Sequence, residues 1–108
     1  MVNGVKGPID IDICPNIGSY SNTTDLYSAL EAFGNNMVDH ETKNIYFECT
    51  ASPFYDAHTP RNETWATIYR SENGRYFLTC YNALSSNIPV ILLWKWSGGW
   101  ATKSIPLT

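Results

Sequence analysis

The chain has 108 residues, a length that suits one domain with a single hydrophobic core. Hydrophobic residues make up 44% of it and charged residues only 16%, a composition that excludes a disordered chain. The net charge is −3 and the seven Lys and Arg are scattered, which argues against nucleic acid as a partner because phosphate recognition needs concentrated positive charge. We therefore expect residues 1–108 to form a single domain without a nucleic-acid partner.

No segment predicts export or a membrane span. The first residues lack the apolar core of a signal peptide, and no window approaches the run of about 18 apolar residues that a spanning helix needs. The three cysteines, Cys14, Cys49 and Cys80, are widely spaced and form no CxxC pair, as is typical of reduced thiols. We expect a cytoplasmic protein, in which the sequons at Asn22 and Asn62 carry no glycan.

The first predicted element is a short strand over residues 9–13, where Ile alternates with Asp. Residues 14–18 contain Pro15 and Gly18, which we expect to end that strand and to form a break.

A helix is predicted over residues 22–34. Asn22 or Thr23 can cap its N-terminus, and Gly34 with Asn35 provides a left-handed stop. The apolar stripe of this helix has the i, i+4, i+7 spacing and consists of Leu26, Leu30 and Phe33.

The rest of the chain reads as strands. A run rich in aromatic and β-branched residues predicts a strand at 44–50, followed by a long loop at 51–62. Two hairpins follow: 65–70 with 75–81, joined through Asn73-Gly74, and 90–96 with 100–107, joined through residues 97–99. The predicted fold is therefore α+β, an antiparallel β-meander of four to five strands packed against one N-terminal helix.

Aromatic residues are abundant at 14%, and they supply the first candidate binding surface. Trp94 and Trp96 share one face of a predicted strand while Lys95 points the other way, and Trp100 follows the turn. The commoner arrangement would place the Trp94 and Trp96 face inward as core beneath the helix. Facing outward, the same hairpin would be a contact surface, because Trp is enriched at interface hot spots.

The second candidate surface surrounds the Asn73-Gly74 turn. Tyr69, Arg70, Arg75 and Tyr76 form a Tyr/Arg patch of the kind found at protein interfaces. The alternative interpretation is a solvated hairpin tip with no partner.

Catalytic and metal-binding patterns are weak. Asp10 and Asp12 fit the solvent face of a strand better than a cation site, because the sequence nominates no further oxygen ligands. His40 and His58 stand apart in predicted loops without a zinc-type spacing. Cys14 is the best placed thiol for nucleophilic catalysis, although a free cysteine is more often a small buried hydrophobe. We predict no metal, no cofactor and no catalytic residue.

No motif specifies a function, so three classes stay open. We favour a small non-enzymatic module that binds another protein, as an accessory, immunity or inhibitory protein does, because the chain is acidic, rich in aromatic residues and poor in catalytic groupings. The alternatives are a small metal- or cysteine-dependent hydrolase and a binder of carbohydrate or another small ligand through tryptophan. A stand-alone chain of this kind is expected from bacteria or their phages. The last predicted strand leaves an edge that only Lys103 and Pro106 defend, so we also expect a weak tendency to form a homodimer.

Overall fold

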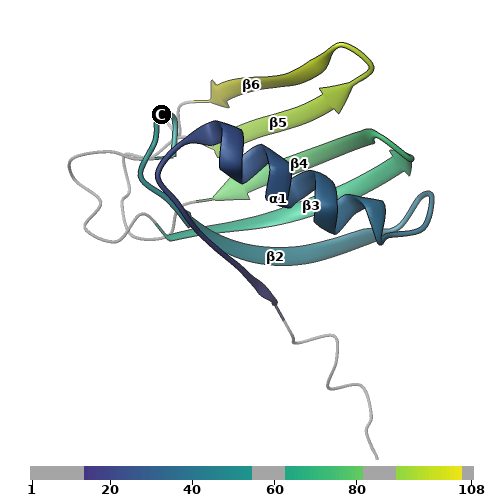
Figure 1. Cartoon of the computed structure of the whole chain (residues 1–108), viewed down its shortest axis with the longest axis horizontal. Helices are drawn as coiled ribbons and strands as arrows, with labels where there is room; N and C mark the ends of the chain where they lie inside the picture. The colour runs from purple at the N-terminus through teal and green to yellow at the C-terminus, as the bar shows by residue number, and fades with distance from the viewer. Residues whose placement is uncertain (1–13, 55–62, 82–89, 106–108) are drawn as a thin grey trace, which may run out of the picture.

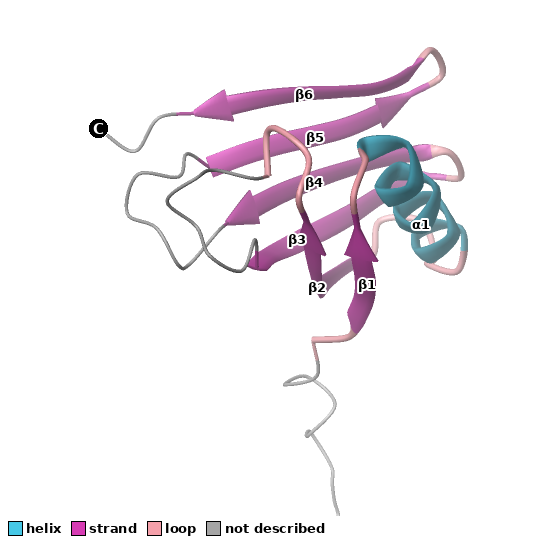
Figure 2. Ribbon diagram, turned by 60° about the vertical axis from the view of Figure 1, so that its left-hand side comes forward, coloured by secondary structure: helices cyan, strands magenta, loops and turns pink. Residues whose placement is uncertain are grey.

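The computed structural model describes residues 14–54, 63–81 and 90–105, which form a six-stranded sheet with one helix on one of its faces (Figures 1 and 2). The strands lie side by side in the order of the chain. Neighbouring strands are antiparallel except β1 and β2, which are parallel. The α+β prediction is confirmed, with six strands in place of four to five. The bounds are β1 Asn16–Tyr20, α1 Thr23–Asn35, β2 Thr42–Cys49, β3 Glu63–Glu72, β4 Arg75–Tyr81, β5 Val90–Trp96 and β6 Gly99–Ile105.

Strand β1 corrects one prediction, because residues expected to form a break belong to the sheet. Its pairing with β2 is irregular between Asn16 and Ser19, and Gly18 lies between them with a φ of 124°. The backbone of this segment is hydrogen-bonded to β2: Tyr46 N donates to Pro15 O, just before β1, over 2.9 Å. A strand this short and irregular has no period-two pattern, so only its tertiary pairing reveals it. The strand predicted at 9–13 lies outside the described residues.

Helix α1 begins as predicted and ends differently. Asn22 caps it, since its Oδ1 accepts a 2.8 Å hydrogen bond from the backbone N of Asp25. The predicted left-handed stop at Gly34 is wrong: Gly34 is a helical residue, and the cap is Asn36 in a right-handed conformation. The reason is packing, because the ring of Tyr76 occupies the space that a side chain at position 34 would need.

Both predicted hairpins are present. β3 and β4 are joined through Asn73-Gly74, where Gly74 has a φ of 87°, and β5 and β6 meet at a turn before Gly99, whose φ is 125°. Glycine adopts positive φ at these positions without steric cost, and the pairing of β3 with β4 is irregular between Arg70 and Glu72, next to the first turn.

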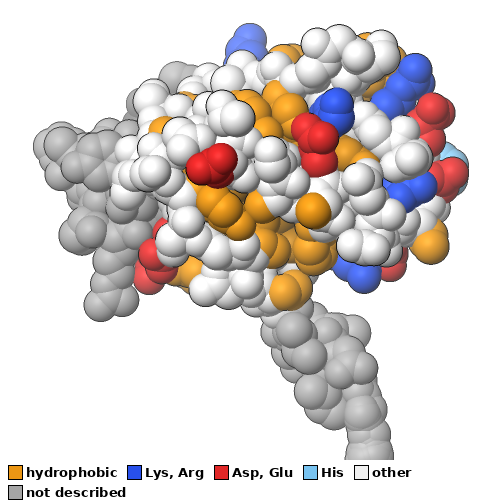
Figure 3. All heavy atoms as spheres, viewed as in Figure 1, with side chains coloured by type: hydrophobic (Ala, Val, Ile, Leu, Met, Phe, Trp, Pro, Cys, Tyr) orange, Lys and Arg blue, Asp and Glu red, His pale blue; other side chains and the backbone are white. Residues whose placement is uncertain are grey.

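The core lies between α1 and the sheet. Leu26 and Leu30 of the predicted stripe are fully buried, and Phe33 packs at the edge of the same cluster. On the helix side, hydrophobic side chains reach the surface mainly in the middle, and charged side chains gather at the end with the hairpin turns (Figure 3). The buried hydrophobic residues on the helix side of the sheet are Ile45, Phe47, Cys49, Ala66, Ile68, Tyr76, Leu78, Cys80, Ile91 and Leu93.

Candidate functional site

The face of the sheet opposite α1, here called the open face, carries most of the exposed apolar surface that the structure describes. No described element covers it (Figure 2). Because strand side chains alternate, the residues between the buried ones point to this face, and the cross-strand register confirms the assignment. Among the described residues six large hydrophobic side chains are classed as exposed, and all but Val38 belong to the open face: Trp65, Phe77, Tyr81, Trp96 and Ile105.

Aromatic side chains form two rows across the open face. In the first aromatic row, Tyr46, Trp65 and Tyr81 are direct cross-strand partners on β2, β3 and β4. The Tyr46 and Trp65 ring centroids are 5.6 Å apart. In this row the β-meander therefore brings together three aromatic residues that lie far apart in the sequence.

The second aromatic row lies nearer the hairpin turns. Tyr69, Phe77 and Trp94 are direct partners on β3, β4 and β5, and Trp96 extends the row with a ring centroid 6.3 Å from that of Phe77. The row between the two aromatic rows is smaller and more polar. It contains Asn44, Thr67 and Thr79.

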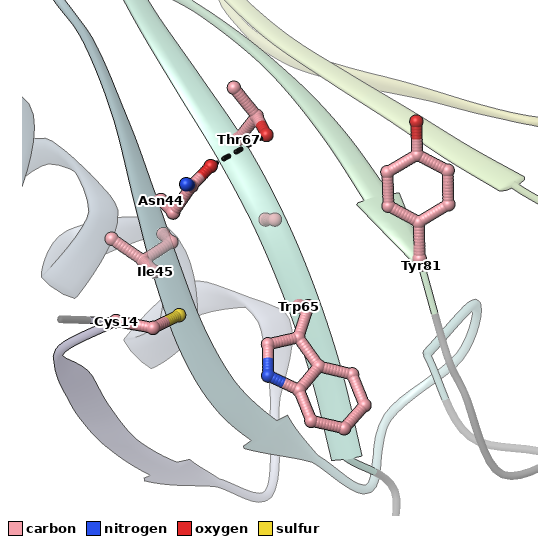
Figure 4. A pocket seen from close by; sticks show the side chains of 7 residues that line it. Cys14, Asn44, Ile45, Trp65, Thr67 and Tyr81 are labelled. Carbon is pink, nitrogen blue, oxygen red and sulfur yellow. Dashed lines mark hydrogen bonds between the residues drawn. The ribbon is translucent and has the colours of Figure 1, made fainter. Parts of the chain in front are cut away.

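A shallow pocket lies where the polar row meets the first aromatic row (Figure 4). Its volume is about 240 Å³. The Trp65 and Tyr81 rings stand on neighbouring strands beside it, and Thr67 Oγ1 donates a 3.0 Å hydrogen bond to Asn44 Oδ1. Cys14 reaches the pocket from the segment before β1.

The two ends of the open face differ in charge. Glu48 and Glu63 are cross-strand partners beyond the first aromatic row. Glu48 accepts a 2.7 Å hydrogen bond from the Tyr46 hydroxyl, and desolvation together with this hydrogen bond raises the pKa of Tyr46. At the opposite end, the Arg75 guanidinium lies 4.3 Å from the Trp96 ring centroid. Among the described residues, two carboxylates thus lie next to the first aromatic row, and an arginine lies next to the second.

The tryptophans of the C-terminal hairpin are divided between the two faces. Trp94 and Trp96 share a face, as predicted, but that face is the open one, so the expectation that they form core beneath the helix is wrong. Ile91 and Leu93 occupy the helix side instead. Trp100 lies on the helix side, where it stacks on Tyr27 at 4.9 Å and donates a 2.7 Å hydrogen bond from Nε1 to Glu31. The three tryptophans therefore do not form one surface.

The predicted patch around the first hairpin turn is divided in the same way. Tyr69 and Arg75 belong to the open face, whereas Arg70 and Tyr76 face the helix. Arg70 Nη1 donates to three carbonyl oxygens at the C-terminal end of α1, including Met37 O at 2.6 Å, and Nε pairs with Asp39 at 3.0 Å. Tyr76 is fully buried. Arg70 and Tyr76 therefore contribute to packing against the helix end.

Four aromatic residues of the open face were not identified as candidates from the sequence: Tyr46, Trp65, Phe77 and Tyr81. The signal that could have found three of them is the register of the Asn73-Gly74 hairpin, which places Trp65 opposite Tyr81 and Tyr69 opposite Phe77. Tyr46 needs the pairing of β2 with β3, which the sequence does not specify.

The residues considered for catalysis are not assembled into a site in the described structure. Burial raises the pKa of the Cys14 thiol, away from the reactive thiolate. His40 Nδ1 is 2.8 Å from the Tyr69 hydroxyl. Within residues 14–54, 63–81 and 90–105, no three His, Cys, Asp or Glu side chains are grouped so that they could hold a metal. Asp10, Asp12 and His58 lie outside the described residues.

In the described part of the chain, no helix has the length and apolar character that crossing a membrane requires. Comparisons with models of protein families, with characterised proteins and with solved structures found no match to this chain.

Proposed function

We propose that the protein is a small non-enzymatic module that binds another protein through the open face. The observation that carries this proposal is the concentration of five of the six exposed large hydrophobic side chains on that one face. Exposed apolar side chains that gather on one face often mark an interaction site, and Trp and Tyr are enriched at binding hot spots.

The exposed fractions indicate how much binding energy the face could supply. Phe77 is 42% exposed and Trp96 is 48% exposed, and the two rings are in edge contact. Full burial of an aromatic side chain contributes about 1.5–3 kcal/mol, so covering the exposed half of each ring would contribute about 1 kcal/mol. Two such rings are enough to change the affinity of a complex more than tenfold.

The test compares variants of the open face with a matched control. The protein is used to capture a partner from its source cells, and the partner is identified, purified and titrated by calorimetry. A variant with Phe77→Thr and Trp96→Thr keeps β-forming residues while it removes both rings. The control is Val38→Thr, which alters an apolar side chain that is 66% exposed and lies outside the sheet.

We expect stoichiometric binding, an affinity at least about tenfold weaker for the double variant, and no change for Val38→Thr. Circular dichroism verifies that the variants are folded. A partner that binds all three proteins equally, or the absence of any stoichiometric partner, would refute the proposal.

A further inference from the structure

We propose that two copies of this chain pair through the outer edge of β6 and form one continuous antiparallel sheet. The inference concerns the edge of the sheet and goes beyond the function proposed for the open face. Among the described strands β6 is the last of the sheet, with β5 as its neighbour (Figure 2). Residues 102–105, which alternate between the two faces of the sheet, are all exposed. An exposed edge strand of this kind is a template for pairing with another chain.

The backbone of β6 presents hydrogen-bonding groups at alternate residues. Trp96 and Gly99 are cross-strand partners on either side of a two-residue turn, so they form a hydrogen-bonded pair of the ladder. Such pairs alternate along antiparallel strands, so the N–H and C=O groups of Trp100, Thr102 and Ser104 point away from β5. A second strand can therefore pair with these three residues while the β5–β6 hairpin stays intact.

The length of β6 selects one register for pairing with a copy of itself. The middle residue of Gly99–Ile105 is Thr102. An antiparallel pair that uses the whole strand therefore has Thr102 on a two-fold axis, and Trp100 of one copy lies opposite Ser104 of the other. The outward residues then pair only with one another, which allows about six backbone hydrogen bonds between the copies.

The open-face side chains of β6 complement one another in size in this register. The small residues Gly99 and Ala101 come first along the strand, and the large residues Lys103 and Ile105 follow. Antiparallel pairing sets Ile105 opposite Gly99 and Lys103 opposite Ala101, so each large side chain meets a small one. A register centred on Lys103 would instead place two lysines opposite each other, which is destabilising. This self-complementarity favours a second copy of the chain as the occupant of the edge.

The same pairing covers two exposed hydrophobic side chains. Ile105 is 40% exposed and Trp96 is 48% exposed. Ile105 of one copy lies opposite Gly99 of the other, and Trp96 is the cross-strand partner of that glycine. The backbones of Ile105 and Trp96 are then two strand spacings apart, about 9–10 Å, a gap that these two large side chains can close. A Cβ at Gly99 would meet no atom within 4 Å, so its position does not obstruct this contact.

The symmetry of the pair determines how the open faces are arranged. A two-fold axis perpendicular to the sheet keeps both copies of α1 on one side and both open faces on the other. The dimer therefore presents two open faces side by side, which would increase the avidity for a partner with two binding sites. One pair of edge strands buries less area than a standard interface, so we expect a weak, concentration-dependent dimer.

Sedimentation equilibrium of the full chain, from about 10 µM to about 1 mM, measures the association. We expect the mass to rise from that of a monomer toward that of a dimer. Thr102→Pro removes the outward N–H at the two-fold axis, at an edge position where proline is tolerated, and should raise the Kd at least about tenfold. The matched control Thr102→Val keeps the N–H and a β-branched side chain, and should change the Kd less than about twofold.

Cysteine substitutions test the register. Thr102→Cys and Ser104→Cys are each made in a Cys14→Ser background and incubated with oxidised glutathione. Hydrogen-bonded cross-strand partners have Cα atoms about 5.5 Å apart, which suits a disulfide, so Thr102→Cys should form a covalent dimer on non-reducing electrophoresis. The two copies of position 104 are more than about 13 Å apart, so Ser104→Cys should stay largely uncrosslinked.

A monomeric mass up to about 1 mM, an association unchanged by Thr102→Pro, or crosslinking of Ser104→Cys as fast as that of Thr102→Cys would overturn the inference. Circular dichroism verifies that Thr102→Pro is folded. If it is not, the two cysteine variants decide, since both substitutions are at exposed positions. Loss of the dimer would leave the proposed function standing, because the partner titration with the open-face variants does not depend on it.

Discussion

Replacing Gly34 with alanine should destabilise the protein, although alanine is the better helix former. Gly34 lies in the last turn of α1 and is buried against Tyr76. A Cβ at this position would lie 2.5 Å from Cε1, 2.7 Å from Cζ and 2.8 Å from Cδ1 of the Tyr76 ring. Carbon atoms normally pack at about 3.5–4.0 Å, so the overlap is about 1 Å.

The Tyr76 ring has little room to move away. It is fully buried, its hydroxyl donates to Asn35 Oδ1, and it accepts a 3.2 Å hydrogen bond from the backbone N of Gly74. Overpacking of a core typically costs about 1–3 kcal/mol, whereas helix propensity favours alanine by about 1 kcal/mol. We therefore expect Gly34→Ala to lower the free energy of unfolding by about 1 kcal/mol, with the loss reaching about 2 kcal/mol if the ring does not shift.

Urea denaturation followed by tryptophan fluorescence measures this change. The matched control is Gly98→Ala, because a Cβ at Gly98 meets no atom within 4 Å, and it should leave stability nearly unchanged. Combining Gly34→Ala with Tyr76→Leu should remove most of the penalty relative to Tyr76→Leu alone, since the clashing ring is absent. A Gly34→Ala protein as stable as the wild type, or more stable, would refute the argument.

Three further results are expected. Arg70→Met should lower the free energy of unfolding by about 2 kcal/mol in urea, because the carbonyl oxygens at the end of α1 lose a charged donor; an unchanged midpoint would contradict that role. Burial raises the pKa of Cys80 from 9.0 to about 12, so between pH 9 and pH 12 the unfolded chain loses this proton first, and Cys80 should lower stability by about 1.4 kcal/mol per pH unit. Cys80→Ala should make the fall in stability with pH shallower by about that amount in urea titrations over this range, and an unaltered slope would count against the assignment. The outer edge of β6 has no described partner, so light scattering at high concentration should detect a homodimer; a strictly monomeric mass would dispose of it.

The elements with strong local signals were predictable. The Asn73-Gly74 hairpin and the strand before Trp96 are encoded by turn chemistry and runs of strand-forming residues, and both are present. Asn22 begins the helix as its side-chain chemistry predicts. β1 escaped prediction because its hydrogen bonds depend on β2, about 30 residues later in the chain, and not on its own sequence.

The candidate site was only partly predictable. Alternation showed that Trp94 and Trp96 share a face, and this is confirmed by their register. The same alternation could not show that Trp65 and Tyr81 stand beside each other, or that Tyr46 joins them, because those contacts arise from strand pairing.

The class of fold, the helix and the two C-terminal hairpins could be predicted because each depends on residues close together in the chain. Which face of the sheet α1 covers depends on tertiary packing. Period-two alternation gives every strand two faces, and the packing of Leu26 and Leu30 against Ile68 and its neighbours determines which of them is buried. The aromatic side chains on the opposite face are exposed as a result of that choice.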